Sequence, residues 1–212
     1  MRISLRHKFI FFHIPKNAGE SIRAAIDTVA PPDQNTLDWS NSYYDVTKDP
    51  QGLHFLTGVK ILPYHMNQQD LQPFLDHIGQ RVDNFFEFAV VRHPYARVAS
   101  LARYTQTINA INSSKPVLNI DQVLDKIEEN TETFYASQLR WTSHPASKKI
   151  HVYRYENLNN DWLDIRSKLK LDLPDLPRIN VNPRAQQTLT TEQQARCYSL
   201  LEREFTELGY KR

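Results

Sequence analysis

Two groups of residues carry cationic and hydroxyl side chains at points where the chain is expected to turn. The first group, in chain order, is Lys16, Asn17, Ala18, Gly19, Glu20 and Ser21. The second group is Arg92 with Ser100, eight residues later. A lysine ammonium and an arginine guanidinium both bind phosphate or sulfate oxygens, and the arginine can do so with two parallel hydrogen bonds. These residue types predict a site for a ligand with two anionic groups.

The first group is expected to lie at the start of a helix. An apolar run over residues 9–12 predicts a buried strand, and the apolar spacing in residues 22–26 predicts a helix after a short turn. Helix N-termini attract anions through free N–H groups and the helix dipole. Lys16 precedes the only glycine of the turn, whereas an ATP or GTP loop has its lysine after the second glycine. The turn therefore predicts an anion site of a different kind.

The second group follows another buried strand. Residues 85–91 are rich in aromatic and β-branched side chains, and Arg92 comes directly after them. Pro94 is well placed as the first residue of a helix that reaches about residue 112. The order of strand, polar turn and helix therefore occurs twice.

The remaining pattern predicts the fold class. A third strand is expected at residues 149–155, and further helices at about 121–129, 133–141, 162–171 and 191–208, the last capped by Thr190 with Gln193. Strands that alternate with helices predict an α/β fold, here a single domain over residues 1–212 with a three-layer parallel sheet flanked by helices. Ligands bind such sheets at the carboxyl ends of the strands.

The stretch between the two groups is less regular. Residues 30–52 predict a long surface loop, whose Trp39, Tyr43 and Tyr44 either line a sugar or ring substrate or pin the loop to the core. Residues 53–62 predict a strand and residues 69–78 a short helix.

Composition limits the class of protein. A net charge of +2 argues against nucleic acid as a partner, and the single Cys197 excludes an internal disulfide. We expect a soluble, cytoplasmic protein, because no run approaches the ~18 apolar residues of a membrane span and the N-terminal apolar run is short. Nothing in the sequence indicates the oligomeric state.

The two groups lie in segments that resemble a known family. FFHIPKNAGESI (11–22) and FAVVRHPYARVAS (88–100) are similar to the 5′-phosphosulfate and 3′-phosphate motifs of sulfotransferases that use PAPS (3′-phosphoadenosine 5′-phosphosulfate), especially the carbohydrate branch. The segments YRYENL (153–158), LPRIN (176–180) and EFTELGY (204–210) extend the resemblance. It implies a fold related to P-loop kinases, PAPS as co-substrate, PAP (3′-phosphoadenosine 5′-phosphate) as product, and chemistry without a metal.

The resemblance also implies residue roles. Lys16 contacts the transferring sulfuryl group, residues 17–21 cradle the 5′-phosphosulfate, and Arg92 and Ser100 hold the 3′-phosphate. Glu20 replaces a threonine that is usual in the family, so we expect its backbone N–H rather than its carboxylate to face the ligand. Arg97 is expected to be structural.

Sulfuryl transfer to a hydroxyl needs in-line positioning, charge neutralisation and a base. His65, which lies between the two motifs, is the expected base because histidine titrates near neutral pH. Glu20 is the alternative base, and a packing role for His65 also stays open. The expected acceptor is a carbohydrate or glycolipid, although a phenol or lipid alcohol fits too. An ATP-dependent small-molecule kinase and a non-catalytic nucleotide- or glycan-binding module are the alternative functions.

Overall fold

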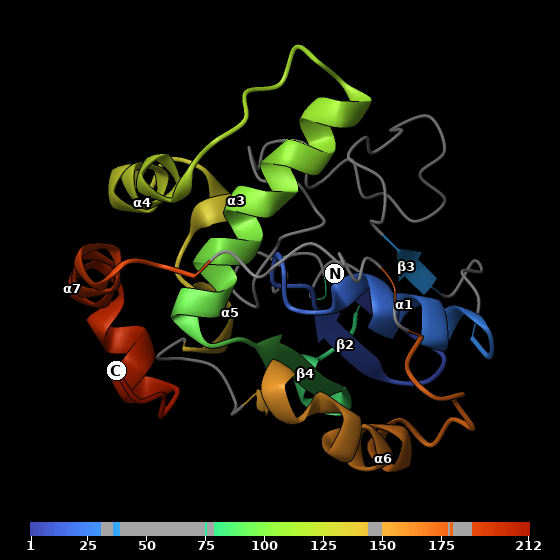
Figure 1. The fold of residues 1–212 in the computed structure, drawn as a ribbon. Coiled ribbons are helices and arrows are strands. Elements are labelled where there is room, and N and C mark those ends of the chain that lie inside the picture. Colours follow the sequence, from blue (N-terminus) through green and yellow to red (C-terminus); the bar gives the residue numbers. More distant parts are fainter. Residues whose placement is uncertain (31–35, 39–74, 76–78, 144–149, 178, 180–187) are drawn as a thin grey trace.

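The computed structural model describes residues 1–30, 36–38, 75, 79–143, 150–177, 179 and 188–212 (Figure 1). Four of the sequence predictions lie outside this part of the chain. They are the strand at residues 53–62, nearly all of the helix at 69–78, the aromatic side chains of Trp39, Tyr43 and Tyr44, and the candidate base His65.

A five-stranded sheet, in the order β3-β1-β2-β4-β5, forms the centre of the fold. The strands are β1 (Arg2–Ser4), β2 (Phe9–Phe12), β3 (Thr36–Asp38), β4 (Phe86–Val91) and β5 (His151–Arg154). Strands β2, β4 and β5 are parallel, as predicted, but β1 pairs antiparallel with both β2 and β3. The sheet is therefore mixed. The short connection between β1 and β2 explains this, because a parallel pair needs a much longer crossover.

Helices flank the sheet, which confirms the α/β class. In chain order they are α1 (Gly19–Asp27), α3 (Pro94–Ile111), α4 (Ile120–Glu129), α5 (Leu139–Thr142), α6 (Leu158–Leu169) and α7 (Thr191–Glu207). Short 3₁₀ turns lie at Val82–Asn84, Thr133–Tyr135 and Tyr155–Asn157. Pro94 is the first residue of α3, and Thr190 and Gln193 form the capping box of α7, as predicted.

Two of the sequence predictions are wrong. The predicted loop at residues 30–52 contains β3, whose three residues are too few to give a recognisable period. The predicted helix at residues 133–141 is a 3₁₀ turn followed by the short α5. The backbone N–H of Gln138 donates to the Glu204 carboxylate at 2.5 Å, so a contact with α7 takes the place of a helical hydrogen bond.

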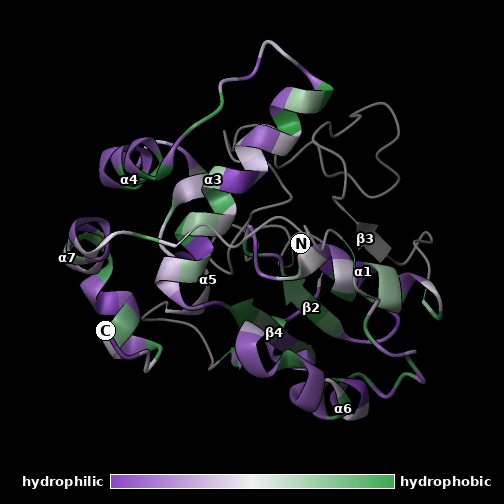
Figure 2. Ribbon diagram, in the orientation of Figure 1, coloured by the Kyte–Doolittle hydropathy of each residue, from purple (hydrophilic) through white to green (hydrophobic). Residues whose placement is uncertain are grey.

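Alternating side chains of β2 build two cores. Phe9 and Phe11 pack with residues of α1 and α6 on one face of the sheet, while Ile10 and Phe12 pack with Trp141 of α5 on the other. Figure 2 shows β2 and β4 as largely hydrophobic and the outer surfaces of α4, α6 and α7 as largely hydrophilic.

A third core lies among α3, α4 and α7, which stand together to one side of the sheet (Figure 1). Val98 and Leu101 from α3, Leu124 from α4, and Cys197 and Phe205 from α7 are all buried there. The packed group holds α3 rigidly, and α3 carries Ser100.

Within the described residues, no helix combines the length and apolarity needed to cross a membrane.

Candidate active site

The site lies where three parallel strands end. Because β2, β4 and β5 are parallel neighbours, their carboxyl ends meet at one edge of the sheet. Lys16 lies shortly after β2, Arg92 directly after β4, and Tyr155 directly after β5. A cavity of about 540 Å³ opens at this edge. The structure brings together around it every predicted site residue that it describes: Lys16, Asn17, Ala18, Gly19, Glu20, Ser21, Arg92 and Ser100.

The loop between β2 and α1 turns through left-handed backbone at two residues. Lys16 has φ of 70° and Ala18 has φ of 64°, although neither is a glycine. The first hydrogen bond of α1 runs from the N–H of Ile22 to the carbonyl of Ala18 at 3.1 Å. The preceding N–H groups of residues 19–21 have no helical carbonyl to bind, and these residues line the cavity. The strained turn therefore presents a helix N-terminus to any anion in the cavity.

Gly19 is required at its position by the ring of His13. A Cβ atom on residue 19 would lie 2.0 Å from the Nε2 atom of His13. The His13 side chain is buried and lines the same cavity. The glycine thus allows the loop to lie directly on the imidazole ring.

Asn17 uses its side chain to attach the loop to the protein. Its Nδ2 donates to the backbone carbonyl of Val90 at 2.8 Å and to the Oε1 of Gln138 at 2.7 Å. Asn17 is almost fully buried, at 1% exposure. Residues 17–21 are predicted to cradle an anion. The amide nitrogen of Asn17 is already engaged, so Asn17 can offer only its backbone N–H to such a ligand.

The ammonium group of Lys16 lies 4.0 Å from the centroid of the Tyr104 ring. Burial, together with the nearby positive charges of Arg92 and Arg103, lowers the pKa of Lys16 from 10.5 to about 8. A pKa lowered in this way means that the cation is poorly solvated and is repelled by its positive neighbours. An anion beside Lys16 would relieve both effects.

Arg92 connects the loop after β4 to the loop that carries Lys16. Its Nη1 donates to the backbone carbonyl of Lys16 at 3.3 Å, and its guanidinium carbon lies 4.1 Å from the centroid of the Tyr155 ring. Burial lowers the pKa of Arg92, although an arginine keeps its charge at neutral pH. Ser100, 9% exposed, lines the same cavity from α3. The two cations therefore belong to one continuous site.

Glu20 is the acidic member of the loop, and its carboxylate pairs with a neighbour on α1. The Oε2 atom lies 3.4 Å from the Nη1 of Arg23, one turn further along the helix. The pairing draws the carboxylate toward Arg23, which leaves the backbone N–H as the group that Glu20 can offer to an anion.

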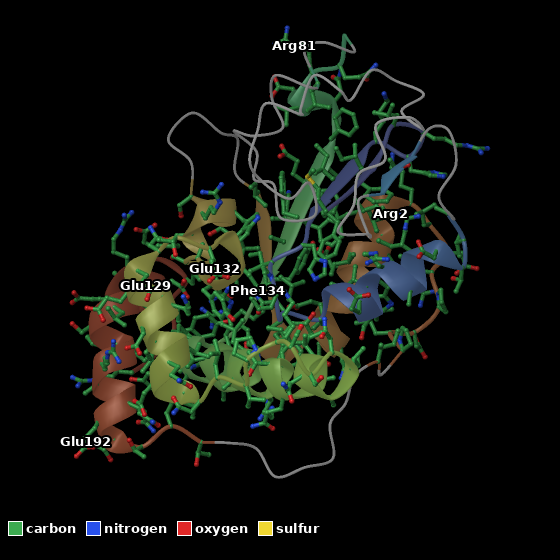
Figure 3. All side chains as sticks on the ribbon, turned by 90° about the horizontal axis from the view of Figure 1, so that it is seen from above. Arg2, Arg81, Glu129, Glu132, Phe134 and Glu192 are labelled. Atoms are coloured by element: carbon green, nitrogen blue, oxygen red, sulfur yellow. The ribbon has the colours of Figure 1, made fainter. Side chains whose placement is uncertain are left out.

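Sequence reasoning missed several residues that shape the site. Glu156 accepts hydrogen bonds from the backbone N–H of His93 at 2.8 Å and from the Tyr210 hydroxyl at 3.1 Å, so it links the loop after β4 to the C-terminal segment. Tyr155 and Glu156 could have been found, because Tyr155 is the last residue of the strand predicted at 149–155 and Glu156 follows it, as Arg92 follows the strand before it. Phe134 could not have been found, because the sequence predicts a helix at residues 133–141 where the chain forms a 3₁₀ turn. Phe134 is partly buried and lines the cavity, and Figure 3 labels it near the middle of the view and Glu192 at the periphery.

Arg97 supports the loop, in agreement with the structural role expected for it. It is 1% exposed, and it donates to the backbone carbonyls of Pro15 at 3.3 Å and Phe134 at 3.4 Å.

Among the residues that the structure describes, no three His, Cys, Asp or Glu side chains are grouped so that they could hold a metal ion.

Comparison with known proteins gives one match. A sequence profile described as the sulfotransferase family matches residues 1–210 of the 212 in the chain. No curated protein and no solved structure matches the chain. The matched span includes both loops that line the cavity and all of α7. The chain therefore belongs to the sulfotransferase family, whose activity is sulfuryl transfer.

Proposed function

We propose that the protein transfers a sulfuryl group from PAPS to a hydroxyl of a carbohydrate or glycolipid. The observation that carries this proposal is the pair of cations, Lys16 and Arg92, at adjacent strand ends on one cavity. PAPS carries two separated anionic groups, a 5′-phosphosulfate and a 3′-phosphate. The loop at residues 16–21 suits the first group, and Arg92 with Ser100 suits the second.

The transfer itself is an in-line displacement. The acceptor oxygen bonds to sulfur, the bond between sulfur and the bridging oxygen breaks, and its electron pair stays on the phosphate of PAP. In this proposal Lys16 neutralises the charge that grows on that oxygen, because a preformed cation needs no reorganisation at the moment of reaction. Lys16→Ala should lower kcat by two or more orders of magnitude, by analogy with the ~3–4 kcal/mol lost with an oxyanion donor.

The acceptor hydroxyl must give its proton to a base, and we propose His65. Glu20 is the competing candidate, and its pairing with Arg23 argues against it. The variants His65→Ala and Glu20→Gln separate the two residues. His65→Ala should abolish turnover while PAP still binds. An active His65→Ala enzyme together with an inactive Glu20→Gln enzyme would assign the base to Glu20.

Binding of PAP without magnesium tests the donor. A ligand that binds only the folded state raises its stability by roughly RT ln(1 + [L]/Kd), or about 2.7 kcal/mol at 100-fold excess over Kd. PAP should therefore raise the melting temperature in the presence of a chelator, and Mg-ATP should have a smaller effect. Stabilisation by Mg-ATP alone would reject PAPS as donor and favour a kinase.

An assay with radiolabelled PAPS tests the acceptor. Sugars, glycolipids and phenols would be compared at equal concentration, with label transfer as the readout. Transfer to phenols alone would reject the proposed carbohydrate acceptor. PAP binding without transfer to any acceptor would instead favour a non-catalytic nucleotide-binding module.

A further inference from the structure

A fully buried polar cluster connects the two anion-binding loops to α7. Its centre is the side chain of Gln138, at 0% exposure, just before α5. Its outer member is the carboxylate of Glu204 on α7, also at 0% exposure. Neither residue lines the cavity, and neither was singled out from the sequence.

The amide of Gln138 is bonded to both loops at once. Its Oε1 accepts from the Nδ2 of Asn17 at 2.7 Å and from the backbone N–H of Arg92 at 2.9 Å. Its Nε2 donates to the backbone carbonyl of Arg92 at 2.8 Å. The two bonds to Arg92 hold its backbone on both sides, much as a neighbouring strand would. One side chain therefore spans the gap between the residue after Lys16 and the residue that carries the second cation.

Glu204 fixes the orientation of this amide. The second hydrogen of Nε2 is donated to the Oε2 of Glu204 at 2.8 Å, and the backbone N–H of Gln138 is donated to its Oε1 at 2.5 Å. A carboxylate accepts and does not donate, so the NH₂ group of Gln138 must face it and the carbonyl oxygen must face Asn17 and Arg92. All four hydrogen-bonding positions of the amide are then filled. A buried amide that is fully paired in this way has one low-energy orientation.

We infer that Gln138 is the positioning residue that sets the spacing between the two anion sites, with Glu204 holding it in place. The inference rests on the proposed function, because it assigns the 5′ and 3′ groups of PAP to the two loops. A ligand held at two points gains affinity from the second contact only if the two sites lie at the matching distance. Loosening Gln138 should therefore cost a doubly anchored ligand much more than a singly anchored one.

Three nucleotides measure this difference by calorimetry or competition. PAP engages both sites, 5′-AMP engages only the loop at residues 16–21, and 3′-AMP engages only the site of Arg92. In Gln138→Met, which keeps the length of the side chain but has no amide, PAP should bind at least about tenfold more weakly. Binding of 5′-AMP and 3′-AMP should each change no more than about threefold.

Two further variants make the test decisive. Glu204→Gln places an NH₂ group against one of the two donors of Gln138 and leaves the other bond in place. Because this change disturbs the amide less than Gln138→Met does, it is the variant to use if Gln138→Met does not fold. It should show the same selective loss for PAP. Gln194→Met removes a side-chain hydrogen bond of similar kind to the Leu189 carbonyl at the start of α7, and it should leave all three affinities unchanged.

The outcomes separate this inference from the proposed function. Equal losses for all three nucleotides, or unchanged PAP affinity in folded variants, would overturn the positioning role while PAP binding by the wild-type protein stands. Failure of the wild-type protein to bind PAP would overturn the proposed function and the positioning role together.

Discussion

Under the proposed function, the lowered pKa of Lys16 should make the affinity for PAP depend on pH. The ammonium group of Lys16 has a pKa lowered to about 8, because it is buried and lies near Arg92 and Arg103. A bound phosphate stabilises the protonated form, so the pKa rises in the complex and binding takes up a proton. Affinity should be greatest below pH 8 and should fall as the pH rises through 8.

The size of the effect follows from the fraction of Lys16 that is protonated before binding. For a pKa of about 8, that fraction is about 0.9 at pH 7 and about 0.09 at pH 9, so the affinity should fall about tenfold between them. The phosphate groups of PAP contribute little, because their second pKa is about 6. At pH 8, binding should take up about half a proton.

Calorimetry at pH 7, 8 and 9, repeated in buffers with different ionisation enthalpies, measures both quantities. Lys16→Met should bind PAP weakly and almost independently of pH, whereas Lys168→Met, which changes an exposed lysine of α6, should behave like the wild type. A wild-type affinity that stays constant from pH 7 to pH 9, with no proton uptake at pH 8, would refute the burial and charge repulsion assigned to Lys16.

Three shorter predictions concern the loops. Arg92→Ala should weaken PAP binding roughly 10- to 100-fold, as for the loss of hydrogen bonds to a charged group, and unchanged affinity would mean that the 3′-phosphate site is misplaced. Ala18→Gly should raise the free energy of unfolding in urea by about 0.5–1 kcal/mol, because Ala18 has left-handed backbone, whereas the control Ala24→Gly within α1 should lower it by a similar amount. Gly19→Ala should lower the free energy of unfolding by roughly 1–3 kcal/mol and weaken PAP binding, because its methyl group would collide with His13; equal stability to the wild type would contradict that packing.

Much of the site could be predicted because its signals are local. The apolar runs that became β2 and β4 are continuous in the sequence, the segment of β5 alternates apolar and polar residues, and Pro94 marks the start of α3. The carboxyl ends of neighbouring parallel strands meet at one edge of the sheet, so the sequence alone predicts that Lys16 and Arg92 lie close together. Strands β1 and β3 have three residues each and give no such signal.

The structural support of the site could not be predicted, because it depends on contacts between distant residues. Gln138 and Glu204 are separated by 66 positions, and only the folded chain places the carboxylate against the backbone of Gln138. The same contact replaces the helix that the pattern of residues 133–141 predicts. Here a tertiary hydrogen bond overrides the local helix propensity, and the periodicity of the sequence gives no sign of such a bond.

The charges around the cavity show why neutral groups hold its loops. Within the described residues, neither Lys16 nor Arg92 forms an ion pair with a carboxylate, and a carbonyl oxygen or an aromatic ring contacts each cation instead. The nearest carboxylates are engaged elsewhere, Glu20 with Arg23 and Glu156 with the His93 backbone and Tyr210. If a carboxylate were bound to either cation, the ligand would have to displace it. The carboxylate would also already offset the desolvation of the cation, so an anionic ligand would gain less by binding. Holding the loops through the neutral amide of Gln138 places no carboxylate on either cation, so burial and the neighbouring arginines keep the pKa of Lys16 low, and a bound anion would oppose both effects.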